Sequence, residues 1–235
     1  MKVIFKRELR AYLKSVTGFV FVAVLVLFVG ILTTLYNVAY FNPSISYALS
    51  DMMLVSALLI PILTMRLFAE ERRSGAYRLL YSLPLRSSDI ILGKYFAILT
   101  LFALPVALMA ILPLIFSIFG EVNLLASYAS LLCFVLFGAA TLALCTFLAS
   151  LTDNMVLSAI FSYIAVIILY LADTLTGLLP SGSIAAKLLS VFSFFSKFEP
   201  YMYGLFDAGA LIYYATVCVA FVFFTVRSFE SKKLI

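Results

Sequence analysis

Residues able to do acid–base, nucleophilic or metal chemistry are few in this sequence. It has no histidine, and so it lacks the commonest general base and metal ligand. Its 3 cysteines, Cys133, Cys145 and Cys218, lie in apolar runs without the CxxC spacing of metal or redox sites. We interpret them as small packing residues, and we predict neither a catalytic residue nor a metal site.

The carboxylates that adjoin apolar runs lie at the ends of those runs. Asp51, Asp173 and Asp207 lie at the ends of apolar runs on one side of the membrane, and Asp153 lies at the end of a run on the other side. Ion-coupled transporters usually place carboxylates or broken helices nearer the middle of the membrane. We therefore assign no ion site, and chemistry within the membrane by carboxylates alone is disfavoured.

One Gly-Lys pair, Gly93-Lys94, has to be compared with phosphate-binding loops. Those loops require a glycine five residues before the second glycine and a Ser or Thr after the lysine. Ser88 and Tyr95 occupy these positions here. We predict no ATP site and no cofactor in this chain, so that any ATP and Mg would be bound by a partner.

The elements that position these residues follow from the composition. The 235 residues are 65% hydrophobic and 11% charged, against about 45–50% and 25% in soluble domains. The apolar residues form long runs, each near the roughly 20 residues needed to cross a bilayer as a helix. We predict an all-α integral membrane protein, a single transmembrane domain over 1–235. The expected spans are 16–40, 47–68, 95–119, 124–151, 155–179 and 208–226.

The basic residues indicate the orientation. Most of the 16 Lys and Arg lie in the N-terminal segment, in the loop between spans two and three, or at the C-terminal end. Six spans place these three regions on one side, and only Lys187 and Lys197 lie on the other. Because cytoplasmic loops are enriched in Lys and Arg, we expect both termini in the cytoplasm and a multi-pass protein of the plasma membrane. The net charge of +5 therefore does not indicate a nucleic-acid partner.

The N-terminal residues 1–14 mix apolar and basic side chains. This mixture predicts a short helix in the cytoplasmic interface, with its cations near anionic lipid head groups. An ordinary positively charged anchor is the alternative.

Apolar residues recur every three or four positions in the loop between spans two and three. Ala76, Leu79, Leu80 and Leu83 predict one apolar face of an amphipathic helix that ends before Pro84. The alternative is a solvated loop lying along the membrane.

An interrupted apolar segment, 177–207, follows span five. A helical stripe of Ile184, Leu188, Val191, Phe192 and Phe195 predicts a re-entrant or interfacial segment. Plain aromatic residues at the membrane interface are the alternative.

Two motifs resemble a known family. The loop contains, in order, Phe68-Ala69-Glu70-Glu71-Arg72-Arg73-Ser74-Gly75, Leu79-Leu80, Ser82-Leu83-Pro84 and Ile91-Leu92-Gly93-Lys94. The later motif comprises Ser196-Lys197-Phe198-Glu199 and Phe206-Asp207-Ala208-Gly209. Both are similar to ABC-2 type transporter permeases, closest to the gliding-motility and copper-enzyme-maturation subgroup. The specific motifs cover about 40 residues, whereas the span count agrees over the whole chain.

The resemblance implies a mechanism and a set of partners. The loop would be a coupling helix docking on a cytoplasmic ABC ATPase dimer, which drives two permease chains to export a substrate. A second permease chain, identical or related, and an additional membrane-anchored extracytoplasmic subunit are implied partners, in a bacterial cell inner membrane. The implied ATPase-coupling residues are Glu70, Glu71, Arg72, Gly75, Leu79, Leu83, Pro84, Gly93 and Lys94.

Two other classes of function remain open. A membrane scaffold, or a mechanical or assembly subunit of an ATPase-driven complex, could have the same spans and charges without moving a substrate. An intramembrane enzyme acting on lipid would need paired carboxylates, which the spans lack at mid-depth. The residues name neither the substrate nor the path it would take.

Overall fold

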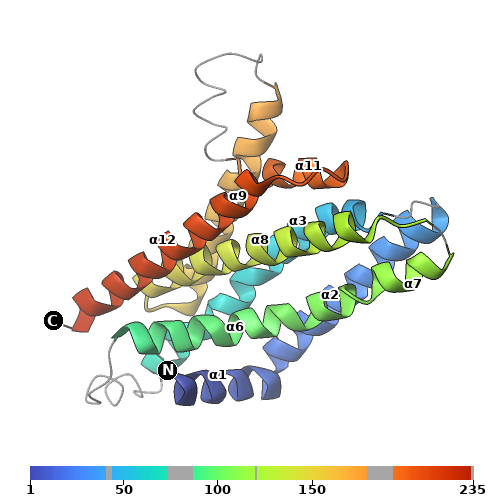
Figure 1. The fold of residues 1–235 in the computed structure, drawn as a ribbon. Coiled ribbons are helices and arrows are strands. Elements are labelled where there is room, and N and C mark those ends of the chain that lie inside the picture. The colour runs from blue at the N-terminus through green and yellow to red at the C-terminus, as the bar shows by residue number, and fades with distance from the viewer. Residues whose placement is uncertain (41–43, 74–86, 120, 179–192, 234–235) are drawn as a thin grey trace.

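The computed structural model describes residues 1–40, 44–73, 87–119, 121–178 and 193–233 (Figure 1). Every regular element in these ranges is helical. The elements are α1 (Lys2–Lys14), α2 (Val16–Thr33), η1 (Thr34–Ala39), α3 (Ser46–Thr64), α4 (Arg66–Arg73), α6 (Ser87–Met109), α7 (Leu112–Phe119), α8 (Leu124–Leu151), α9 (Met155–Leu178), η2 (Ser196–Phe198), α11 (Glu199–Met202) and α12 (Ala208–Lys233). Of the two short η elements, η1 is π-helical and η2 is a 3-10 turn.

Six helices are long and apolar enough to cross a membrane, which confirms the predicted all-α architecture and its number of spans. The candidate spans are Val16–Ala39, Ser46–Ala69, Ser87–Ile118, Leu124–Leu151, Met155–Thr176 and Ala208–Ser231. The chain is therefore a multi-pass membrane protein.

The third span differs from its predicted bounds of 95–119. Helix α6 begins at Ser87, because Ile90 and Ile91 are buried against other helices and continue the apolar surface below residue 95. The span is also interrupted between α6 and α7. Pro113, the second residue of α7, has no N–H to donate to the preceding turn, and a break is the expected result. The last helix likewise extends beyond residue 226, since α12 ends at Lys233.

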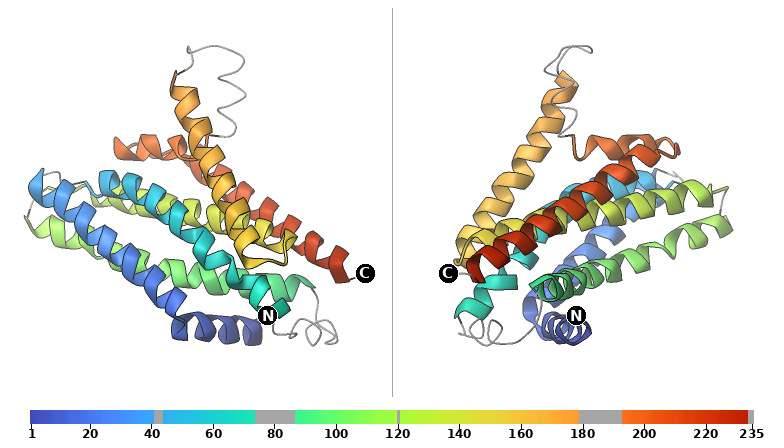
Figure 2. Two further views of the ribbon diagram at one scale, coloured as in Figure 1. Left: turned by 180° about the vertical axis from the view of Figure 1, so that it is seen from behind. Right: turned by 60° about the vertical axis from the view of Figure 1, so that its left-hand side comes forward.

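Helix α8 lies at the centre of the bundle and packs against α3, α6, α9 and α12. In the hydrophobic window of its span 67% of residues are buried, against 17% for α9 and α12. Small residues allow this close packing, as in other membrane bundles. At Gly138 an added Cβ would lie 2.2 Å from a ring carbon of Phe102 on α6. Helices α2, α9 and α12 lie on the outside of the bundle (Figure 2). They carry many exposed apolar side chains, which suit contact with lipid.

Both chain ends lie at one end of the bundle, together with the beginning of α6 (Figures 1 and 2). The described parts of the basic segments, namely α1, the start of α6 and the end of α12, therefore lie on one side of the bundle. That this side faces the cytoplasm stays a prediction.

The segment before α12 is described from residue 193 onward. Phe194, Phe198 and Tyr201 are buried, and α11 contacts α3 and α8. Gly204 has φ +72°, a left-handed conformation that favours glycine and turns the chain toward α12. The predicted stripe residues Ile184, Leu188, Val191 and Phe192 lie outside the described residues, and the re-entrant path stays a prediction.

Candidate functional site

Helix α1 lies across the basic end of the bundle and packs on α6 and α2. Ile4 and Tyr12 are buried, and Glu8 lies between them on the same face at i, i+4 spacing. The Tyr12 hydroxyl donates a hydrogen bond to the Leu63 carbonyl of α3, 3.2 Å away. The N-terminal segment is therefore a helix in contact with α2, α3 and α6, and its position in the membrane interface stays a prediction.

Lys94 is the central residue of this contact. Its side chain is 1% exposed, although it comes from the basic loop motif. Its Nζ donates to the Leu67 carbonyl at 2.9 Å and lies 3.7 Å from Glu8 Oε1. The same atom lies 5.5 Å from the ring centroid of Phe68, within cation–π range. A buried ammonium needs such partners, because isolated burial of a charge is strongly unfavourable.

Local backbone features place Leu67 and Phe68 beside Lys94. Helix α3 contains Pro61 and ends at Thr64, and a turn at Met65 separates it from α4. The Met65 N–H still donates to the Pro61 carbonyl at 3.0 Å, so that α4 continues closely from α3. The α4 end of the loop is thereby joined to the second span.

Gly93 permits α1 to approach α6 closely. A Cβ at this position would lie 3.1 Å from Ile4 Cγ2 and 3.3 Å from the Met1 carbonyl oxygen, tighter than most contacts. On the other side, the Phe68 and Phe229 rings pack with centroids 6.4 Å apart, which brings in α12. We call Ile4, Glu8, Leu67, Phe68, Gly93 and Lys94 the Lys94 junction, because these residues connect α1, α4 and α6.

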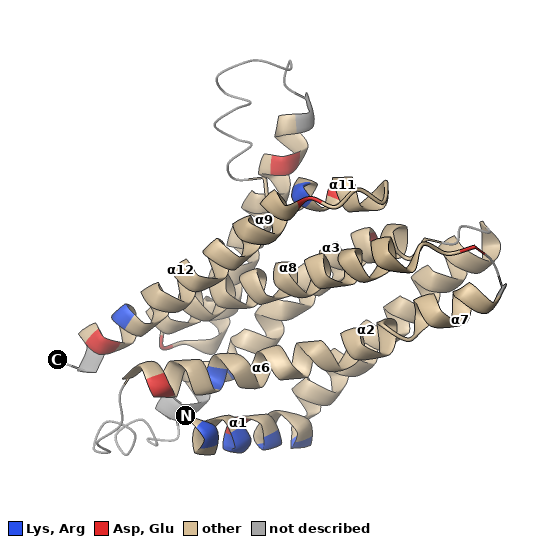
Figure 3. Ribbon diagram, viewed as in Figure 1, with Lys and Arg blue, Asp and Glu red and all other residues tan. Residues whose placement is uncertain are grey.

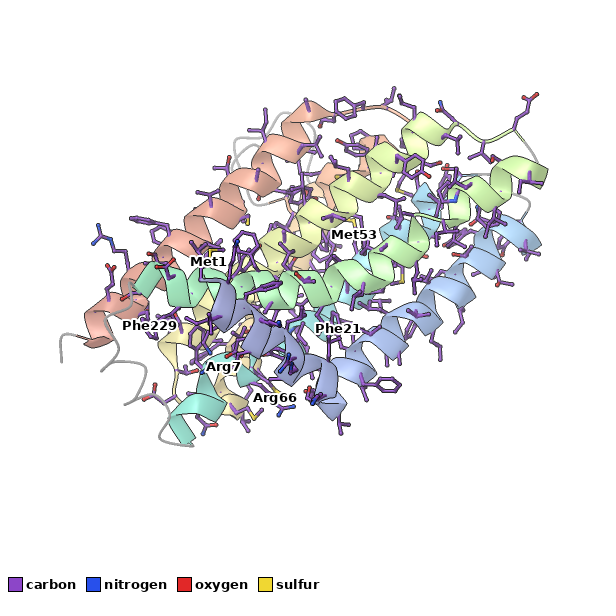
Figure 4. The ribbon with its side chains drawn as sticks, turned by 60° about the horizontal axis from the view of Figure 1, so that its bottom comes forward. Met1, Arg7, Phe21, Met53, Arg66 and Phe229 are labelled. Atoms are coloured by element: carbon purple, nitrogen blue, oxygen red, sulfur yellow. The ribbon has the colours of Figure 1, made fainter. Side chains whose placement is uncertain are left out.

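Two further polar contacts lie at this end of the bundle, one within α1 and one between α4 and the first turn of α2. Arg7 Nη2 donates to Glu8 Oε1 at 2.6 Å, which gives Glu8 a second cation besides Lys94. Arg66 of α4 donates to the Thr17 hydroxyl of α2. Figure 4 views this face of the molecule, with Met1, Arg7 and Arg66 labelled along α1 and the nearby helices. The connection between α1 and α2 is therefore also attached to α4.

The predicted coupling residues fall into three groups. Glu70, Glu71 and Arg72 lie on the last turns of α4, and their role in coupling stays a prediction. Gly93 and Lys94 lie in the Lys94 junction. The remaining four, Gly75, Leu79, Leu83 and Pro84, lie outside the described residues.

Sequence reasoning missed the residues of α1 that complete the junction. Ile4, Glu8 and Tyr12 recur at four-residue spacing, which defines one helix face that includes a single carboxylate. That spacing was the available signal. It could not name Lys94 as the partner, which lies 86 positions further along the chain.

A second polar contact lies at the other end of the bundle. Asp173 of α9 accepts hydrogen bonds from the backbone N–H groups of Phe194 at 2.9 Å and Phe195 at 2.6 Å. It also accepts from the Ser196 backbone N–H at 3.4 Å and from the Ser196 hydroxyl. These bonds fix residues 194–196 to α9. We interpret Asp173 as a structural anchor of this segment.

The described residues offer little else for chemistry. Within them, no group of three or more His, Cys, Asp or Glu could bind a metal ion. Buried hydroxyls mostly donate to carbonyls of their own helix, and Ser46 pairs with Ser130 of α8 at 2.8 Å. The Lys94 junction is the candidate site because it unites basic-end helices with the predicted loop.

These features define a class: a helical, multi-pass membrane protein whose basic end is organised around a buried lysine. No protein-family model matches the chain, and a search among curated proteins finds no similar sequence.

Proposed function

We propose that this chain is the permease subunit of an ABC-2 type transporter, coupling ATP hydrolysis by a separate cytoplasmic ATPase dimer to substrate export. Two permease chains would form the path. The sequence motifs described above suggest the family, and the Lys94 junction supports the mechanism.

The single observation that carries the proposal is the attachment of both ends of the predicted coupling loop. Helix α4 leads into residues 74–86 and α6 leads out of them. Lys94 connects the two helices through its 2.9 Å bond to Leu67. A loop whose ends are bonded together and to α1 moves the bundle when it is displaced, because packed helices transmit displacement as units. A flexible attachment would dissipate such a motion.

The first test is isolation of the full chain from native membrane in mild detergent, followed by identification of the proteins that remain bound. The proposal requires a soluble ATPase whose activity the permease stimulates. Reversing charge with Glu71→Lys or Arg72→Glu is expected to lower that stimulation at least about tenfold, the effect of losing about 1.4 kcal/mol of coupling. Glu230→Lys is the matched control, since Glu230 lies at the same end on α12 and outside the loop.

Three outcomes separate the proposal from its rivals. A chain that stays active after stringent purification without any ATPase contradicts the proposal. A bound ATPase without ATP-dependent turnover in proteoliposomes supports the scaffold or assembly role instead. Turnover of lipid that is lost when acidic residues are neutralised supports an enzyme.

The orientation has its own test. Single cysteines placed in residues 74–86 of intact cells are expected to resist a membrane-impermeant maleimide. Labelling from outside would place the loop beyond reach of any cytoplasmic ATPase.

A further inference from the structure

Helix α1 has a second, outward face of opposite character to the one that packs on the bundle. Lys6, Arg10 and Lys14 follow each other at four-residue spacing and are exposed. Within the described part of the chain, no acidic side chain forms an ion pair with these three residues. Figure 3 shows the resulting concentration of basic residues along α1.

This outward face is hollowed. An open depression of about 560 Å³ is lined entirely by α1, through Val3, Lys6, Arg7, Arg10, Ala11 and Lys14. Four of the six lining side chains are cations. Arg7 bonds to Glu8, the one acidic residue of α1, whose carboxylate also faces Lys94, so the charge of the depression comes mainly from Lys6, Arg10 and Lys14. The depression is left with strong positive charge.

An apolar surface adjoins the cations where α1 meets the first span. Leu13, Val16 and Phe19 are 51%, 78% and 72% exposed. A ligand suited to both surfaces has an anionic head and an acyl chain. A soluble phosphate would leave the apolar side chains in water, and an acidic protein would have to displace lipid from the end of the span.

We infer that the outward face of α1 binds anionic phospholipids, with the phosphate at Lys6, Arg10 and Lys14 and the acyl chain along Leu13, Val16 and Phe19. Basic residues attract anionic lipid, and an interfacial helix buries its apolar side chains among the acyl chains. The inference requires only a membrane-embedded chain, and it applies equally to a transporter subunit or a scaffold.

The site has a structural consequence through the inner face of the same helix. Ile4, Glu8 and Tyr12 contact Gly93 and Lys94 of α6 and Leu63 of α3, so bound lipid holds α1 against these two helices. Lipid binding therefore stabilises the Lys94 junction.

The test measures binding of fluorescent phosphatidylglycerol and fluorescent phosphatidylcholine to the full chain in neutral detergent. The double variant Lys6→Gln/Arg10→Gln removes two cations from the depression. Lys197→Gln/Arg227→Gln is the matched control, with the same change of net charge at sites away from α1, Arg227 exposed and Lys197 partly exposed. Each cation near the membrane surface contributes roughly a fivefold gain in affinity at low salt. The first variant, which loses two cations, is therefore expected to bind phosphatidylglycerol about 25-fold more weakly. The control is expected to change less than twofold.

A second variant, Lys6→Arg/Lys14→Arg, keeps the charges and is expected to retain binding. Gel filtration and circular dichroism establish that each variant is folded. Equal losses in the two Gln double variants, or equal binding of the two lipids, would overturn the inference. Displacement by glycerophosphate as effective as by the intact lipid would also overturn it, because the acyl chain would then contribute nothing.

Discussion

Replacing Lys94 by methionine tests the Lys94 junction directly. Methionine keeps much of the aliphatic volume but removes the ammonium that bonds to Leu67 and faces Glu8. The Leu67 carbonyl loses one donor, and the Glu8 carboxylate, 13% exposed, loses one of its cations. We expect a less stable protein in which α1 separates more readily from α6.

The magnitude follows from these contacts. A hydrogen bond to a charged group contributes about 1.5–3 kcal/mol, and breaking a buried pair by removing one partner costs about 3–5 kcal/mol. The cost here lies near the lower value, since Arg7 remains 2.6 Å from Glu8 and methionine avoids the desolvation of a buried ammonium. We expect a loss of about 2 kcal/mol. For a chain of this size that corresponds to a fall in Tm of about 4–8 °C.

Thermal unfolding can be followed with a thiol-reactive dye, because Cys133 and Cys145 are free and buried. Lys2→Met is the matched control, an exposed lysine on the same helix whose replacement should change stability by less than about 0.5 kcal/mol. Adding Glu8→Gln to Lys94→Met removes the carboxylate that was left behind, and should cost less than Glu8→Gln does in the protein that keeps Lys94.

The reasoning is refuted if Lys94→Met unfolds at the wild-type temperature. It is also refuted if the two substitutions are strictly additive, because independent effects would mean that Glu8 and Lys94 do not interact.

Three further predictions concern other parts of the bundle. Gly138→Ala should destabilise the protein by about 1–3 kcal/mol, because the added Cβ would overlap the Phe102 ring. Gly30→Ala is the control: an added Cβ there would have no neighbour within 4 Å, and stability in the same unfolding assay should hardly change. Asp173→Asn replaces one acceptor oxygen by a donor and should speed hydrogen exchange at residues 194–196, with unchanged exchange in α6. Burial raises the pKa of Tyr201 to about 12, so its contribution to stability should be complete below pH 10 and decline as pH rises toward 12. Tyr201→Phe should remove that alkaline dependence and one phenol ionisation near pH 12, and a lost ionisation near pH 10 would contradict it.

Hydropathy predicted the number of spans because a bilayer imposes one dominant length on its helices. The predicted fourth span matches α8 at both bounds, since Asn123 caps its first turn and the residues after Leu151 are polar. The predicted bounds of a span were wrong where protein rather than lipid covers the helix. Ile90 and Ile91 extend α6 below the predicted span because they are buried within the protein, where α1 packs on α6, and hydropathy does not detect burial by a neighbouring helix.

Sequence reasoning identified only part of the candidate site, again because burial by neighbouring helices is not visible in the sequence. The loop motif identified Gly93 and Lys94, while charge counting treated Lys94 as one more exposed cation that orients the membrane topology. Its burial depends on Glu8 and Leu67, which are distant in sequence and belong to different helices. A pair of single positions so far apart leaves no periodic pattern.

The two roles of basic residues at this end of the bundle can now be separated. A cationic side chain at the membrane surface attracts anionic lipid whatever its neighbours, which is the role we infer for Lys6, Arg10 and Lys14. Lys94 is 1% exposed and cannot reach lipid, yet its ammonium requires partners from α1 and α4 to remain buried. Its charge therefore specifies which helices meet, a task that an apolar residue would perform with less selectivity. Neutralising one residue of each kind should reveal the difference. Lys94→Gln should weaken the packing of α1 on α6, whereas Lys14→Gln should weaken lipid binding and leave the Lys94 junction intact.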